Sequence, residues 1–224
     1  MLFIISLLLS FIFIITLSKV IKKYKKTTYV LTILFSIFVT YVYYSSLYLD
    51  SSLIKTILSI LCAPFVFGSF TTALFVVVMY LGISNKDARF TKIAMPIRSE
   101  LSIIACITTF VHNISMVFYI HHYGLNNMEF RFAALISLVL ILLLLPLFLT
   151  SFHCVKTRLK GKTWKRIQSL AYLFYVLLYV HVLIVSIPSA CNGQVRSIIN
   201  IIIYSIVFLY YFQAKIKMIT KKST

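Results

Sequence analysis

Two histidines, His112 and His181, are the residues of this chain whose surroundings most suggest chemistry. Each lies well inside an apolar run of about twenty residues, which is long enough to cross a lipid bilayer as a helix. A histidine within a membrane span is costly unless it has a partner, so each is a candidate functional residue. A neutral imidazole can ligate iron. The alternative is that each histidine only hydrogen-bonds a neighbouring helix.

The composition supports a membrane location for both residues. The chain has 224 residues, of which 61% are hydrophobic and 12% charged, and a mean hydropathy of +1.01. Soluble domains average about 45–50% apolar and about 25% charged residues, so we expect an all-α polytopic membrane bundle. In such a protein the net charge of +18 indicates loops that face an anionic membrane surface rather than a nucleic-acid partner.

Seven spans are predicted. They cover residues 2–20, 28–48, 57–82, 101–120, 132–150, 169–188 and 197–214. The third run is too long for one upright helix and contains Pro64. It predicts a kink or an interfacial first turn at 53–57, with a tilted single span as the alternative.

The basic residues predict the orientation of these spans. Of the 22 Lys and Arg residues, all except Lys55, Arg131 and Arg196 fall in loops on one side, which we assign to the cytoplasm. The N-terminus is then outside and the C-terminus inside. The first apolar run lacks a positively charged start and a small-residue cleavage site, so it is predicted to be a retained span. A bacterial cytoplasmic membrane is the expected location.

His112 and His181 are predicted to lie at the same depth. They follow the predicted starts of two inside-to-outside spans by eleven and twelve residues. At 1.5 Å per residue, each is roughly 16–18 Å from the inner boundary. Paired imidazoles at one depth suit a haem with two axial ligands. On the His112 helix, a stripe of small residues is compatible with haem and equally with tight helix packing.

Other residues are weaker candidates. His121 and His122 are expected in a solvated outer loop, and His153 at the inner interface. The four cysteines have no CxxC or metal-ligand spacing and are predicted to be small apolar fillers. The chain has no Gly-rich phosphate loop, GxGxxG, HExxH or GxSxG motif, and we predict no catalytic residue within it.

The run from Leu145 to His181 resembles the ferric-reductase-like transmembrane domain, most closely its bacterial haem-binding MsrQ (YedZ) branch. The matching residues are Pro146, Thr150, Ser151, Arg158, Gly161, Trp164, Tyr172 and His181. Upstream, Arg98 precedes His112 by fourteen residues as in the family, and the segment from Gly68 is similar to its opening span. The resemblance covers about residues 60–212. It implies a haem b domain at 56–214, two extra helices at 1–55 and a basic tail at 215–224.

The resemblance implies that His112 and His181 are the axial metal ligands of an outer haem. Family members with a second, inner haem have histidines at the positions of Arg98 and Gln168. Because an amide ligates iron poorly beside imidazole, we expect a single haem. A flavin or quinone near Arg98, Trp164, Arg166 and Gln168 would then deliver electrons; the alternative is that these residues only anchor helices at the interface.

The expected function is electron transfer from a cytoplasmic or membrane donor to an external acceptor. No loop is long enough for a soluble domain, so a redox partner protein, either an external reductase or a cytoplasmic flavin protein, is implied. The rival interpretation is a haem-free scaffold or transporter-like subunit that keeps the fold.

Overall fold

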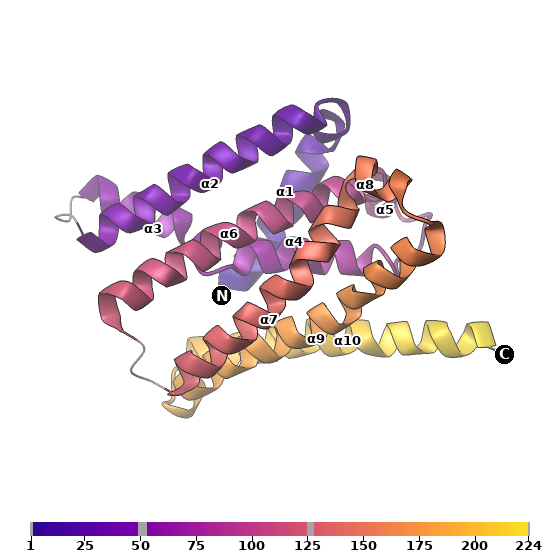
Figure 1. The fold of residues 1–224 in the computed structure, drawn as a ribbon. Coiled ribbons are helices and arrows are strands. Elements are labelled where there is room, and N and C mark those ends of the chain that lie inside the picture. The colour runs from indigo at the N-terminus through magenta and orange to yellow at the C-terminus, as the bar shows by residue number, and fades with distance from the viewer. Residues whose placement is uncertain (1, 49–52, 125–127, 224) are drawn as a thin grey trace. The chain divides into compact units, whose positions relative to one another are not determined.

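The computed structural model describes residues 2–48, 53–124 and 128–223, which are helical almost throughout. Within these ranges no strand occurs, and seven helical stretches are long and apolar enough to cross a membrane. The prediction of an all-α polytopic bundle is therefore confirmed (Figure 1). The inside and outside assignment stays a prediction from charge.

The chain divides into two compact units. The first unit, Leu2–Gly124, contains six α-helices and one 3₁₀ helix. These are α1 (Leu2–Lys23), α2 (Lys25–Tyr48), α3 (Leu53–Val66), α4 (Ser69–Tyr80), α5 (Arg89–Ala94), η1 (Met95–Ile97) and α6 (Arg98–Tyr123). The second unit contains α7 (Met128–Ser151), α8 (His153–Arg158), α9 (Gly161–Cys191) and α10 (Val195–Ser223). The domain boundaries implied by the resemblance stay a prediction.

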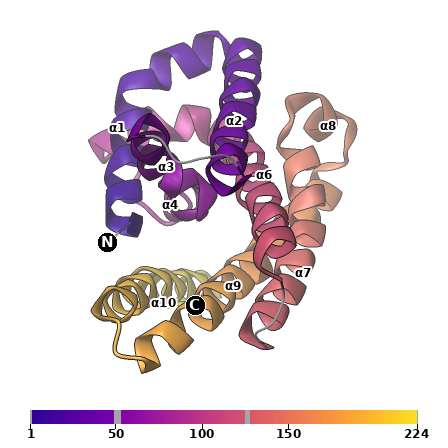
Figure 2. The ribbon, with the colours of Figure 1, turned by 90° about the vertical axis from the view of Figure 1, so that its left-hand side faces the viewer.

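Helix α4 is the buried centre of the first unit. Every residue from Ser69 to Met79 is buried, and α1, α3 and α6 contact this helix (Figure 2). Its hydroxyl groups are satisfied by neighbouring helices: Ser69 bonds Ser6 of α1 at 2.8 Å, and Thr71 donates to Thr108 of α6 at 2.9 Å. Such interhelical bonds stabilise association where lipid supplies little hydrophobic driving force.

The third span is interrupted at Phe67–Gly68, which corrects the predicted position of its irregularity. A helix runs without a break from Leu53 through Pro64 to Val66, and a second helix starts at Ser69. Gly68 has φ +70, a left-handed conformation that glycine adopts without steric cost. Pro64 removes one helical N–H donor, but the chain turns only where Gly68 permits it.

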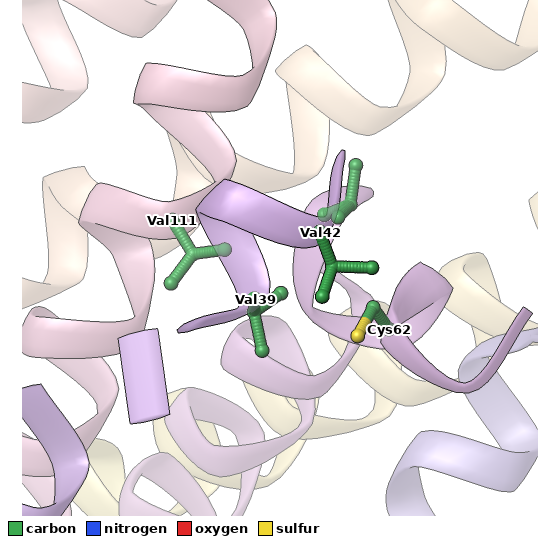
Figure 3. Close-up of a cluster of buried hydrophobic side chains, with 5 residues drawn as sticks. Val39, Val42, Cys62 and Val111 are labelled. Atoms are coloured by element: carbon green, nitrogen blue, oxygen red, sulfur yellow. The ribbon is translucent and has the colours of Figure 1, made fainter. Parts of the chain in front are cut away.

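Apolar and ionic contacts hold α2 to the rest of the first unit. Val39 and Val42 of α2, Cys62 and Val66 of α3, and Val111 of α6 form one buried cluster, four of whose members are labelled in Figure 3. Where α2 and α6 begin, Lys25 of α2 forms an ion pair with Glu100 of α6, whose side chain is 4% exposed. Because Glu100 lies in the first turn of α6, it also complements the positive end of that helix.

The second unit is built on α9, which packs against both α7 and α10. The α9–α10 contact is aromatic: Tyr179 stacks on Phe208 with ring centroids 5.5 Å apart, and its hydroxyl bonds Ser205 at 2.8 Å. Two cysteines here, Cys154 and Cys191, are exposed, so the filler prediction is wrong for them, whereas Cys62 and Cys106 of the first unit are buried.

Candidate functional site

His112 projects from α6 onto the interruption between α3 and α4. Its Nδ1 lies 2.8 Å from the carbonyl oxygen of Val66, the last residue of α3. A helix that ends inside a membrane protein leaves carbonyl groups that need partners, and His112 supplies one. A carbonyl can only accept, so Nδ1 is the protonated nitrogen of this bond. In a neutral ring Nε2 is then the nitrogen that carries the lone pair.

Gly68 makes room for this imidazole. A Cβ placed on Gly68 would lie 3.1 Å from Cγ and 3.3 Å from Nδ1 of His112, closer than nearly all ordinary contacts. Gly68 therefore meets two demands, a left-handed backbone and the close approach of a ring. Gly68 opens a segment that resembles the family's first span, but the sequence does not reveal its contact with His112. The combination of Pro64, Gly68 and an apolar run is the signal that could have revealed it.

Arg98 lies at the opposite end of α4. Its Nε donates to the carbonyl oxygen of Val78 at 3.2 Å, and its guanidinium lies near Gly82, where a Cβ would be 3.4 Å from Nη2. The carbonyls of the last helical turn attract cations, so this arginine stabilises the end of α4. The position gives Arg98 a role in the fold. Its contact with a cofactor stays a prediction.

Trp164 and Gln168 of α9 meet at one residue of α7. The indole Nε1 donates to the carbonyl oxygen of Thr150 at 3.1 Å, and the Gln168 amide donates to the Thr150 hydroxyl at 2.8 Å. The hydroxyl in turn donates a hydrogen bond to the carbonyl oxygen of Pro146 at 2.7 Å. Thr150 is thus the centre of a polar contact between α7 and α9, a role that the sequence analysis did not assign. Arg166 is exposed and lies outside this contact.

His181 also faces α7. Its Nδ1 lies 3.4 Å from the hydroxyl oxygen of Ser137, which is a long distance for a hydrogen bond. His181 is half-buried. The structure therefore brings Trp164 and Gln168 together, and it places His112 and Arg98 at the two ends of α4. His112 belongs to the first unit and His181 to the second.

The remaining histidines differ partly from expectation. His121 and His122 are exposed, as predicted, but they belong to the last turn of α6 rather than to a loop. The Tyr48 hydroxyl lies 3.1 Å from Nδ1 of His121, and its ring meets that of His122 edge-on at 5.0 Å. His153 starts α8 and is exposed. Helix α6 thus continues to Tyr123, past the predicted end of the span at residue 120, and its last turn packs against Tyr48 at the end of α2.

Within the described ranges, no group of three or more His, Cys, Asp or Glu side chains is arranged to hold a metal ion. A pair of histidines falls below that number, so this observation leaves the predicted axial ligands untested.

Comparison with known proteins finds a relative that matches most of the chain. No family model and no solved structure matches the chain. An uncharacterized protein of Treponema pallidum (strain Nichols) is 33% identical over 217 residues, which cover 95% of this chain. The chain spans 59% of that relative's length.

Proposed function

We propose that the chain binds one b-type haem through His112 and His181 and passes electrons across the membrane to an external acceptor. The observation that carries this proposal is the bond between Nδ1 of His112 and the Val66 carbonyl. Histidines that ligate metals commonly donate their other ring N–H to such a group, which fixes the tautomer and the ring orientation. The resemblance of the two histidine segments to a haem-binding family supports the same function.

The donor set fits haem iron. Both proposed ligands are imidazoles within apolar helices, and the haem would supply a one-electron centre. The residues of the chain then have defined tasks. The Val66 carbonyl keeps Nδ1 of His112 protonated, and Gly68 admits the ring. His181 would supply the second ligand.

A single haem is supported by the surroundings of Gln168. This residue replaces the family's second inner histidine, and its amide is engaged with the Thr150 hydroxyl. The electrons would then come from a flavin or a quinol near the inner end. Trp164, one of the residues expected near this flavin or quinol, donates its indole N–H to the Thr150 carbonyl. The Lys156 Nζ lies over one face of the Trp164 ring, 4.8 Å from the ring centroid. A flavin would therefore stack on the opposite face of the indole.

Absorption spectroscopy tests the proposal. Protein produced with ample haem should show a Soret band that shifts on reduction by dithionite, with about one haem per chain. His112→Ala and His181→Ala should each abolish the band, whereas His153→Ala, a change at an exposed residue of α8, should retain it. A folded wild-type protein that stays colourless would refute haem binding. Two haems per chain would refute the argument from Gln168.

The interrupted third span favours a second candidate, a haem-free scaffold or transporter-like subunit. Helices broken within the membrane occur at the binding sites of secondary transporters, where unwound backbone lines a cavity. Here the break at Phe67–Gly68 is covered by His112. In a haem-free protein, the bond between His112 and the Val66 carbonyl would serve only to stabilise the fold. His112→Ala would then lower stability in a protein that never binds haem.

A further inference from the structure

We propose that the segment from Phe152 to Arg166 binds the headgroups of anionic phospholipids at the membrane boundary. This segment, hereafter the α8 segment, consists of α8, the residues that flank it and the first six residues of α9. It carries six exposed cations. These are Lys156, Arg158, Lys160, Lys162, Lys165 and Arg166. The proposal does not depend on haem binding.

The positive charge of the α8 segment has no counterpart in its own unit. From residue 125 onward the sequence contains one acidic residue, Glu129. It lies in the first turn of α7, at the far end of that helix from α8. Twenty-two residues of helix separate Glu129 from Ser151, or about 33 Å at 1.5 Å per residue. This exceeds the Debye length of about 8 Å at physiological ionic strength, so Glu129 does not neutralise the cations.

Two basic residues of the first unit have acidic partners. Lys25 is paired with the buried Glu100, and Lys92 lies 3.7 Å from Asp87. Among the described residues, no ion pair involves the α8 segment. The positive-inside tendency accounts for basic loops in general. It does not specify which anion meets a cluster of six exposed cations.

The segment lies at the end of the apolar helix α7. Only Phe152 separates α7 from α8, and the Trp164 indole donates to the Thr150 carbonyl in the last turn of α7. Figure 1 shows α8 at the end of α7, next to the start of α9. Phe152, Val155 and Leu159 are half-buried, whereas the cations are exposed. Cations held at this level meet lipid headgroups before they meet a cytosolic protein.

Lipid headgroups fit this arrangement better than a soluble acidic partner does. Trp at a membrane boundary sits at headgroup level, and four to eight Lys or Arg residues next to a span are typical of anionic-lipid binding. Trp164 lies within the cluster, with Lys156 Nζ 4.8 Å from its ring. We therefore expect phosphatidylglycerol or another anionic lipid to lie close to this indole.

Because Trp164 is the only tryptophan of the chain, its fluorescence reports on this segment alone. Purified protein is reconstituted with brominated phosphatidylglycerol or brominated phosphatidylcholine, both of which quench nearby indoles. The ratio of the two apparent affinities is measured on one preparation, so it does not depend on haem content. We expect the wild type to prefer phosphatidylglycerol at least about fivefold at low salt. The preference should weaken at high salt.

The test variant is Lys160→Gln/Lys162→Gln/Lys165→Gln, which leaves Lys156 against the indole. The matched control, Lys19→Gln/Lys22→Gln/Lys23→Gln, removes the same charge from the end of α1. The test variant should lose most of the preference, and the control should retain it. Equal affinities in the wild type, as expected if an acidic protein were the partner, would overturn the proposal. So would an equal loss in both variants, since that would indicate a general charge effect. An unchanged emission maximum shows that the indole environment is intact.

Discussion

Four glycines allow the contact between Gly68 and His112 to be tested apart from backbone strain. Gly68 combines a φ of +70 with a crowded Cβ position. Gly193 has a similar φ of +76, but nothing lies within 4 Å of its Cβ position. Gly82 is crowded by the Met79 carbonyl at 3.2 Å without the unusual φ, and Gly161 has neither feature. Changing each to alanine therefore separates the two costs.

The expected losses of unfolding free energy follow from these geometries. A left-handed conformation costs an alanine about 1–2 kcal/mol. Overpacking of a close contact costs about 1–3 kcal/mol. Gly68→Ala should therefore lose about 2–5 kcal/mol from both costs together, Gly193→Ala about 1–2 kcal/mol from strain alone, and Gly82→Ala about 1–3 kcal/mol from crowding alone. Gly161→Ala, at the start of α9, should change stability by less than about 1 kcal/mol.

Reversible unfolding in mixed detergent micelles, followed by circular dichroism, measures all four variants under one condition. The order of the losses is the essential result, since absolute values depend on the detergent. Gly68→Ala must be more destabilising than Gly193→Ala. If the two losses are equal, the His112 ring does not press on Gly68, and the site described at the α3–α4 interruption is wrong. Combining Gly68→Ala with His112→Ala should recover the crowding part of the loss, because the smaller side chain leaves space.

Three other changes test the remaining contacts by the same unfolding measurement. His112→Ala should cost about 1–3 kcal/mol even without haem, because it strands a buried carbonyl; no loss would show that the bond to that carbonyl is absent. Trp164→Phe keeps an aromatic ring but removes the donor to Thr150, and should cost about 1 kcal/mol; a wild-type stability would contradict the α7–α9 contact. A double-mutant cycle of Lys25→Met and Glu100→Gln should give a coupling energy of about 1–2 kcal/mol, since only one partner is buried; additive losses would rule the ion pair out.

The sequence predicted the spans well and their ends poorly. Seven apolar runs became seven helical spans, because backbone groups in a membrane must be bonded internally and a helix does this over any apolar run. The ends were longer than expected. Helix α9 begins at Gly161 and ends at Cys191, against a predicted span of 169–188. Hydropathy marks the part that lies in lipid, whereas turns and polar contacts decide where a helix ends.

The sequence singles out candidate residues, whereas their contacts come from the structure. His112 stood out because an imidazole in an apolar helix requires a partner. The partner, however, is the Val66 carbonyl, and every residue has a carbonyl group, so no residue type identifies it. The role of Thr150 in the α7–α9 contact was missed for a related reason. A threonine near a helix end is common, and only the folded chain shows that it receives bonds from both Trp164 and Gln168.

The spacing of Arg98 and His112 has an explanation within the first unit that is independent of haem. Fourteen residues bring two side chains back to nearly the same face of a helix and separate them by about 21 Å. Helix α4 has twelve residues, or about 18 Å, and these side chains bond carbonyls of Val66 and Val78 around its two ends. The spacing therefore matches the length of the buried helix that α6 supports. The spacing is therefore accounted for by the fold of the first unit, and evidence for haem must come from the ligand test on His112 and His181.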